Sequence, residues 1–89
     1  MIRERDIENR LRRGVLKKDG LCFKFLSSEA GVPDRIVICN GRVAFVEIKR
    51  PAGKLSPIQL WQQKQITGAG AESWTLWDEA DVDAFVKGL

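Results

Sequence analysis

Two carboxylates and one lysine are the polar residues of this sequence whose types and spacing best fit a chemical role. Glu47 and Lys49 close an apolar run and are separated by one residue, and Asp34 opens an earlier apolar run. Because alternate residues of a β-strand point to the same face, Lys49 should lie beside Glu47. Carboxylate oxygens with no histidine or thiolate nearby suit a hard divalent cation such as Mg²⁺ or Mn²⁺.

A predicted hairpin sets the distance between the two carboxylates. The dipeptide Asn40-Gly41 separates two apolar runs and is typical of a two-residue β-turn. With that turn, counting outward along both strands puts Asp34 opposite Glu47. Like charges opposed in this way have Cβ atoms about 4.5–5.5 Å apart and repel each other. We therefore interpret the pair as a metal site, to which the backbone carbonyl of Ile48 could add an oxygen ligand.

A purely structural role for the same residues is the main alternative. Glu47 and Lys49 could form an ion pair at the end of a strand, and Asp34 could simply follow Pro33 in a turn. The in-register second carboxylate, and the apolar character of the rest of the hairpin, favour a functional site over this alternative.

Composition excludes several other kinds of chemistry. The 89 residues include no histidine, which rules out Ser-His-Asp and Cys-His catalysis and histidine-based zinc sites. Cys22 and Cys39 lie in apolar segments and are expected to be free core residues. The length fits one domain over residues 1–89. With no apolar run long enough for a membrane span and no signal-peptide pattern, we expect a cytoplasmic protein with no membrane partner.

Basic residues concentrate in two parts of a chain whose net charge is only +3. They crowd the N-terminal segment as far as Lys18 and recur between Lys49 and Lys54. These clusters could be solvated helix faces or a surface that faces phosphates. The candidate nucleic-acid-binding residues are Lys24, Arg50, Lys54, Arg12 and Arg13.

Hydrophobic periodicity and turn residues predict three helices and four strands. Ile7, Leu11 and Val15 form an apolar stripe at helical spacing, and Ser56 with Gln59 makes a capping box before a second helix. We expect helices over 3–18, 57–67 and 79–87, and strands over 21–26, 34–39, 42–49 and 73–77. The order α-β-β-β-α-β-α predicts an antiparallel meander whose third strand pairs in parallel with the fourth. The fold class is therefore α/β, with a four-stranded mixed sheet flanked by helices.

Three tryptophans are many for so small a core. Trp61, Trp74 and Trp77 are expected to pack in the interior, although one of them could lie at a contact between subunits.

Several of these segments together resemble a known family. Residues 31–34 (GVPD), 45–49 (FVEIK) and 55–59 (LSPIQ) look like the VRR-NUC family, the virus-type replication-repair nucleases within the PD-(D/E)xK superfamily. Residues 4–11 (ERDIENRL) match its small stand-alone viral or phage members. The resemblance implies a restriction-endonuclease-like fold of the PD-(D/E)xK type over nearly the whole chain.

The resemblance also implies roles for individual residues. Asp34 and Glu47 would be metal ligands, and Lys49 would position or activate the attacking water. Gln59 matches the glutamine that opens the helix after the active-site hairpin. A glutamate of the first helix commonly joins the site; Glu8 or Glu4 could supply it, and the Ile-Glu-x-x-Leu match favours Glu8.

The activity implied is Mg²⁺- or Mn²⁺-dependent hydrolysis of phosphodiesters in branched DNA, with the four-way (Holliday) junction as the expected substrate and a homodimer as the expected assembly. The family's context is DNA replication and repair, in the host cell cytoplasm if the protein is encoded by a phage. Alternatives are a module that binds branched DNA without cutting it, a flap nuclease on the same fold, and a sequence-specific endonuclease of restriction type.

Overall fold

The first helix covers the sheet through a single apolar stripe. In the computed structural model, which describes residues 2–89, helix α1 spans Glu4–Lys17. Ile7, Leu11 and Val15 recur every four residues on α1, and all three are fully buried. Gly20 ends the turn after α1, and a Cβ atom there would lie 2.8 Å from Val15 Cγ1 and 2.9 Å from Cys39 Cβ. Only glycine allows the chain to pass this close to the core.

Three antiparallel strands follow: β1 (Leu21–Lys24), β2 (Arg35–Cys39) and β3 (Arg42–Ile48). In the turn between β2 and β3, Asn40 and Gly41 both have positive φ, as a type I′ hairpin requires. Cys39 therefore pairs with Arg42, and Arg35 pairs with Val46. This is the register that the sequence predicts.

The second half of the chain adds two capped helices and a parallel strand. Helix α2 (Pro57–Gly68) leads to β4 (Glu72–Leu76), which pairs in parallel with β3, and helix α3 (Glu79–Lys87) follows. Ser56 and Gln59 form the predicted capping box, and Asp78 caps α3 by accepting a 2.8 Å hydrogen bond from Asp81 N. The strand order is β1-β2-β3-β4. The predicted mixed sheet and element order are confirmed.

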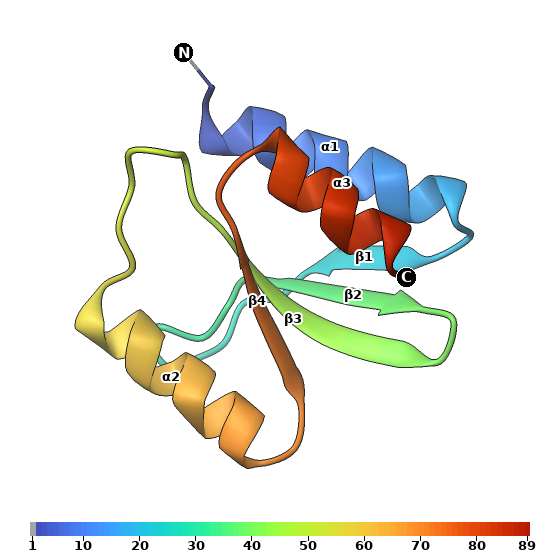
Figure 1. Ribbon diagram of the computed structural model, residues 1–89. Coiled ribbons are helices and arrows are strands. Elements are labelled where there is room, and N and C mark those ends of the chain that lie inside the picture. The colour runs from blue at the N-terminus through green and yellow to red at the C-terminus, as the bar shows by residue number, and fades with distance from the viewer. Residues whose placement is uncertain (1) are drawn as a thin grey trace.

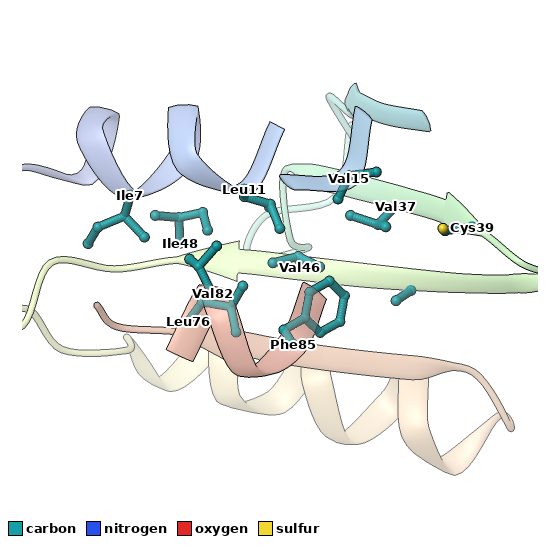
Figure 2. Packing of buried hydrophobic residues seen from close by; sticks show 11 residues of the cluster. Ile7, Leu11, Val15, Val37, Cys39, Val46, Ile48, Leu76, Val82 and Phe85 are labelled. Carbon is teal, nitrogen blue, oxygen red and sulfur yellow. The ribbon is translucent and has the colours of Figure 1, made fainter. Parts of the chain in front are cut away.

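The sheet separates two layers that differ in how well they are packed. Helices α1 and α3 lie together on one face, and α2 lies alone on the other (Figure 1). The buried core fills the space between the sheet and the α1–α3 pair (Figure 2). None of the residues of α2 is buried. The core residues are Ile7, Leu11, Val15, Val37, Cys39, Ala44, Val46, Ile48, Leu76, Val82 and Phe85.

Some predicted boundaries and one packing expectation are wrong. The first strand ends at Lys24 rather than Leu26, and a single backbone hydrogen bond from Phe25 N to Asp34 O continues the pairing. Trp61 and Trp74 are exposed rather than interior. Trp61 lies on α2, of which no residue is buried, and Trp74 contacts Phe85 of α3 while remaining 40 % exposed. The two cysteines are free, as expected.

Across residues 2–89, no helix combines the length and the apolar character that crossing a membrane requires.

Candidate active site

The candidate site lies where the β2–β3 hairpin opens. Arg35 pairs with Val46, so one further step along the same register puts Asp34 opposite Glu47. The first turn of α1 lies over this end of β3, where Ile7 packs near Ile48 (Figure 2). Helix α2 begins on the other side of the sheet at the same end (Figure 1). The two helix starts therefore flank the carboxylates.

The surroundings of Glu47 disfavour its charged form, and no partner among the described residues compensates for this. The residue is only 8 % exposed. Burial, followed by the charge of Asp34, raises the pKa of Glu47 to about 7, and the nearby Lys49 only partly opposes this shift. Within residues 2–89, the Glu47 carboxylate accepts no hydrogen bond and joins no ion pair. A buried carboxylate without a partner is costly unless a cation neutralises it.

This raised pKa predicts a pH-dependent stability. A carboxyl whose folded-state pKa lies above its unfolded value contributes stability below about pH 4.5, and loses it as the pH rises through about 7. In EDTA, Glu47→Gln should therefore be more stable than the wild type at pH 8 by about 1–2 kcal/mol, and close to it at pH 5. Urea unfolding at both pH values measures the difference. An equal difference at pH 5 and pH 8 would contradict the raised pKa.

The donors present at the hairpin end fit a hard divalent cation. Asp34 and Glu47 supply carboxylate oxygens, and Ile48, which follows Glu47 on β3, supplies a backbone carbonyl. In the part of the chain that the structure describes, no three acidic, cysteine or histidine residues gather into a closed cage. Two carboxylates with an open side suit Mg²⁺ or Mn²⁺, because such ions keep waters and bind substrate phosphates.

Lys49 follows β3 and Gln59 lies in the first turn of α2. Lys49 N donates a 3.0 Å hydrogen bond to Leu76 O, which fixes the backbone beside Glu47. The Lys49 side chain forms no ion pair within the described residues. Gln59 Oε1 accepts from Ser56 N at 2.9 Å, so the capping role is confirmed. The Gln59 Nε2 group has no partner among residues 2–89, which leaves a donor available at the start of α2.

The two candidate glutamates of α1 have different surroundings. Glu8 Oε1 accepts a 2.8 Å hydrogen bond from Arg35 Nη2, and the two side chains are 23 % and 10 % exposed. This bond holds the pKa of Glu8 below its usual value. Glu4, one turn earlier, is instead the helix carboxylate whose charge adds to the raised pKa of Glu47. Of the two glutamates, Glu4 is therefore the one whose charge acts on Glu47, whereas Glu8 is engaged by Arg35.

Arg35 is the residue of this region that the sequence analysis did not single out. It follows Asp34 directly, is 8 % exposed, and joins β2 to α1 through Glu8. The feature of the sequence that could have identified Arg35 is that it is the one charged residue among the apolar residues of β2. Its partner is 27 residues away, so spacing alone could not identify it.

The basic candidates do not form one cluster. Lys24 and Arg12 lie close enough to Glu8 to lower its pKa. Arg50 borders a hollow of about 210 Å³ in the loop that follows β3, and Lys54 is exposed in the same loop. Arg13 lines a groove between α1 and α3 instead. Lys24 and Arg12 are therefore near Glu8, Arg50 and Lys54 lie in the loop after β3, and Arg13 lies in the groove between α1 and α3.

Comparisons with known proteins agree with the fold. The chain is 38 % identical over 91 residues to "Putative nuclease p44" of Acyrthosiphon pisum secondary endosymbiont phage 1, covering all of this chain and 97 % of that protein. It also superimposes on a solved "VRR_NUC domain" with a TM-score of 0.86, at 24 % identity and covering 94 % of each chain. No model of a known protein family matches the sequence. The chain therefore belongs to the same family as this phage protein, and its fold is that of a VRR-NUC domain.

Proposed function

We propose that this protein is a Mg²⁺- or Mn²⁺-dependent DNA endonuclease whose active site comprises Asp34, Glu47 and Lys49. The observation that carries the proposal is Glu47, a residue only 8 % exposed, whose carboxylate is opposed by Asp34 and has no hydrogen-bond or ion-pair partner in the described residues. A structural ion pair would instead bring Lys49 within bonding distance of Glu47, and no such pair is present in residues 2–89. The family membership and the likeness to a VRR-NUC domain support the same activity.

The proposed reaction is hydrolysis of a phosphodiester bond. A divalent cation held by Asp34 and Glu47 would withdraw charge from the scissile phosphate and acidify a water molecule. Lys49 would orient the attacking water and offset the negative charge that builds on the phosphorane-like transition state. Gln59 would donate from its free Nε2 group to a phosphate oxygen. Glu4 is our choice for the additional carboxylate, because its charge acts on Glu47 while Arg35 engages Glu8.

The proposed substrate is branched DNA, above all the four-way junction. Basic side chains near the site, such as Lys24 and Arg50, would bind the phosphate backbone, which carries affinity but no sequence information. Structure-selective cutting is therefore expected. We also propose that the enzyme acts as a homodimer in the host cell cytoplasm, because a two-fold symmetric enzyme matches the symmetry of a four-way junction.

The test is cleavage of end-labelled DNA by the wild-type protein. A four-way junction, a flap and a plain duplex are incubated with Mg²⁺, Mn²⁺ or EDTA. The proposal predicts metal-dependent cutting, fastest on the junction. Cutting of the flap alone would retain the active site and remove the symmetric-junction substrate. Binding of the junction with no cutting in any metal would favour the non-catalytic binding module.

A further inference from the structure

Helix α2, which lies alone on its side of the sheet (Figure 1), has a largely polar half-buried side. A helix that packs on a sheet normally buries an apolar stripe, yet Trp61 of α2 is 53 % exposed. Two glutamines instead link α2 to the rest of the chain. Gln62 Nε2 donates to Ala30 O at 3.1 Å, and Gln63 Nε2 donates to Thr75 Oγ1 at 2.9 Å. The half-buried residues of α2 are Gln59, Gln62, Gln63 and Ile66.

Thr75 is the residue of β4 that lies beside Glu47. Strands β3 and β4 pair in parallel, and Glu47 and Thr75 are partners in that register. Paired residues of neighbouring strands project to the same face of a sheet, at a strand spacing of about 4.8 Å. This face is the one on which α2 lies, because Gln63 reaches Thr75 from α2. Glu47 therefore has the Asp34 carboxylate on its β2 side and the Thr75 hydroxyl on its β4 side.

Thr75 and Glu47 have complementary hydrogen-bonding groups that are unused. A threonine hydroxyl has one O–H donor and two lone pairs that accept. Gln63 Nε2 is the donor in its bond with Thr75, so Thr75 accepts there and keeps its own O–H. Among residues 2–89, this O–H has no acceptor and the Glu47 carboxylate has no donor. A free donor and a free acceptor thus lie on neighbouring strands.

We propose that Thr75, held by Gln63, is a positioning residue for Glu47. Its hydroxyl donates to the Glu47 carboxylate and holds that group in the orientation that binds the divalent cation. The inference rests on the function proposed above, and it extends the site to β4 and to the middle of α2. Residues that hold a metal ligand in this way commonly change metal affinity by about 10–100-fold when they are removed.

A purely structural link between α2 and β4 would not require this arrangement. An apolar pair at the two positions would attach the helix without burying polar groups, which is how α1 and α3 pack on the other face. Ser73, two residues earlier on the same face of β4, provides a contrast. It pairs with Phe45, and its buried Oγ has no hydrogen-bond partner among the described residues. Of these two hydroxyls, the one that Gln63 holds is the one beside Glu47.

Mn²⁺ binding without DNA tests the proposal, measured by isothermal titration calorimetry. Thr75→Val keeps the branched shape of the side chain but removes the hydroxyl, and it should weaken Mn²⁺ binding about 10-fold. Thr75→Ser keeps the hydroxyl and should bind within about 3-fold of the wild type. Ser73→Ala is the matched control, because it removes a hydroxyl from the same face of β4 beside Phe45. It should bind Mn²⁺ as the wild type does.

Gln63→Leu tests whether Gln63 acts through Thr75. It should also weaken Mn²⁺ binding, and the double variant Thr75→Val/Gln63→Leu should bind no more weakly than Thr75→Val, because the two residues act as a unit. Thermal unfolding of the same proteins, followed by far-UV circular dichroism, separates positioning from attachment of the helix. Residues that only attach α2 to the sheet would lower the unfolding midpoint and leave the Mn²⁺ affinity of the folded protein unchanged.

Three results would overturn the inference and leave the proposed nuclease in place. They are unchanged Mn²⁺ affinity in Thr75→Val, an equal loss in Thr75→Ser, and an equal loss in Ser73→Ala. A wild type that binds no Mn²⁺ would overturn the inference as well, and the cleavage assay described above then decides separately whether the nuclease activity stands.

Discussion

Replacing Lys49 by methionine should lower the rate of DNA cleavage by about 10²–10³-fold while leaving DNA binding nearly unchanged. Methionine keeps the length and the apolar stem of lysine but removes the charge beside Glu47. In the proposed mechanism that charge acts on the transition state, where negative charge builds on the phosphate, and contributes little to ground-state binding. Single-turnover cleavage at saturating protein and Mn²⁺ measures the rate, and electrophoretic mobility measures the binding.

A matched lysine variant separates this effect from a general loss of positive charge. Lys87→Met removes one charge from an exposed position at the end of α3, remote from the hairpin end. It should cleave at the wild-type rate. Equal rates for the Lys49 and Lys87 variants would remove Lys49 from the mechanism, and weakened binding at an unchanged saturated rate would make it a backbone contact.

The two glutamates of α1 should respond in opposite ways to substitution by alanine. Glu8→Ala leaves the buried Arg35 guanidinium without its partner and should cost about 2–3 kcal/mol of unfolding free energy. Glu4 is exposed, so Glu4→Ala should change stability by less than about 0.5 kcal/mol. It should instead slow cleavage by about 10–100-fold, as expected for a group that tunes the metal ligands. Urea unfolding and single-turnover cleavage together distinguish the two residues.

A double variant checks that the cost belongs to the ion pair. Replacing both Glu8 and Arg35 by methionine removes two charges and keeps similar volumes, so it should be less destabilising than either single replacement. If Glu8→Ala abolished cleavage without loss of stability, Glu8 would be the third carboxylate of the site, as the sequence match favours, and Glu4 would not.

Local signals in the sequence predicted the parts of the fold that position the site. The Asn40-Gly41 turn accepts positive φ at both positions, and this alone sets the register that opposes Asp34 and Glu47. The spacing of Ile7 and Leu11 fixed the buried side of α1 in the same way. These features depend on residues that are close in the chain, so their geometry can be read without knowing the tertiary structure.

Features that depend on distant partners could not be predicted. The ion pair between Arg35 and Glu8 joins two residues from different elements. Charged residues are normally expected at the surface, so the burial of Arg35 could not be predicted from its type. The exposure of Trp61 depends on how many helices cover one face of the sheet, and hydrophobic periodicity does not predict that number. The early end of β1 at Lys24 likewise reflects the short partner strand rather than the apolar run that continues to Leu26.

Whether Asp34 and Glu47 hold a catalytic metal is decided by a Mn²⁺ titration of junction cleavage, run on the wild type and on Glu47→Gln. Glutamine keeps the shape of glutamate but cannot neutralise a divalent cation or share the charge of the pair with Asp34. We expect no cleavage by the wild type in EDTA, a rate that rises with Mn²⁺ to saturation, and no cleavage by the variant at any concentration. Cleavage in EDTA, or a Glu47→Gln protein that cuts at the wild-type rate, would contradict the metal site.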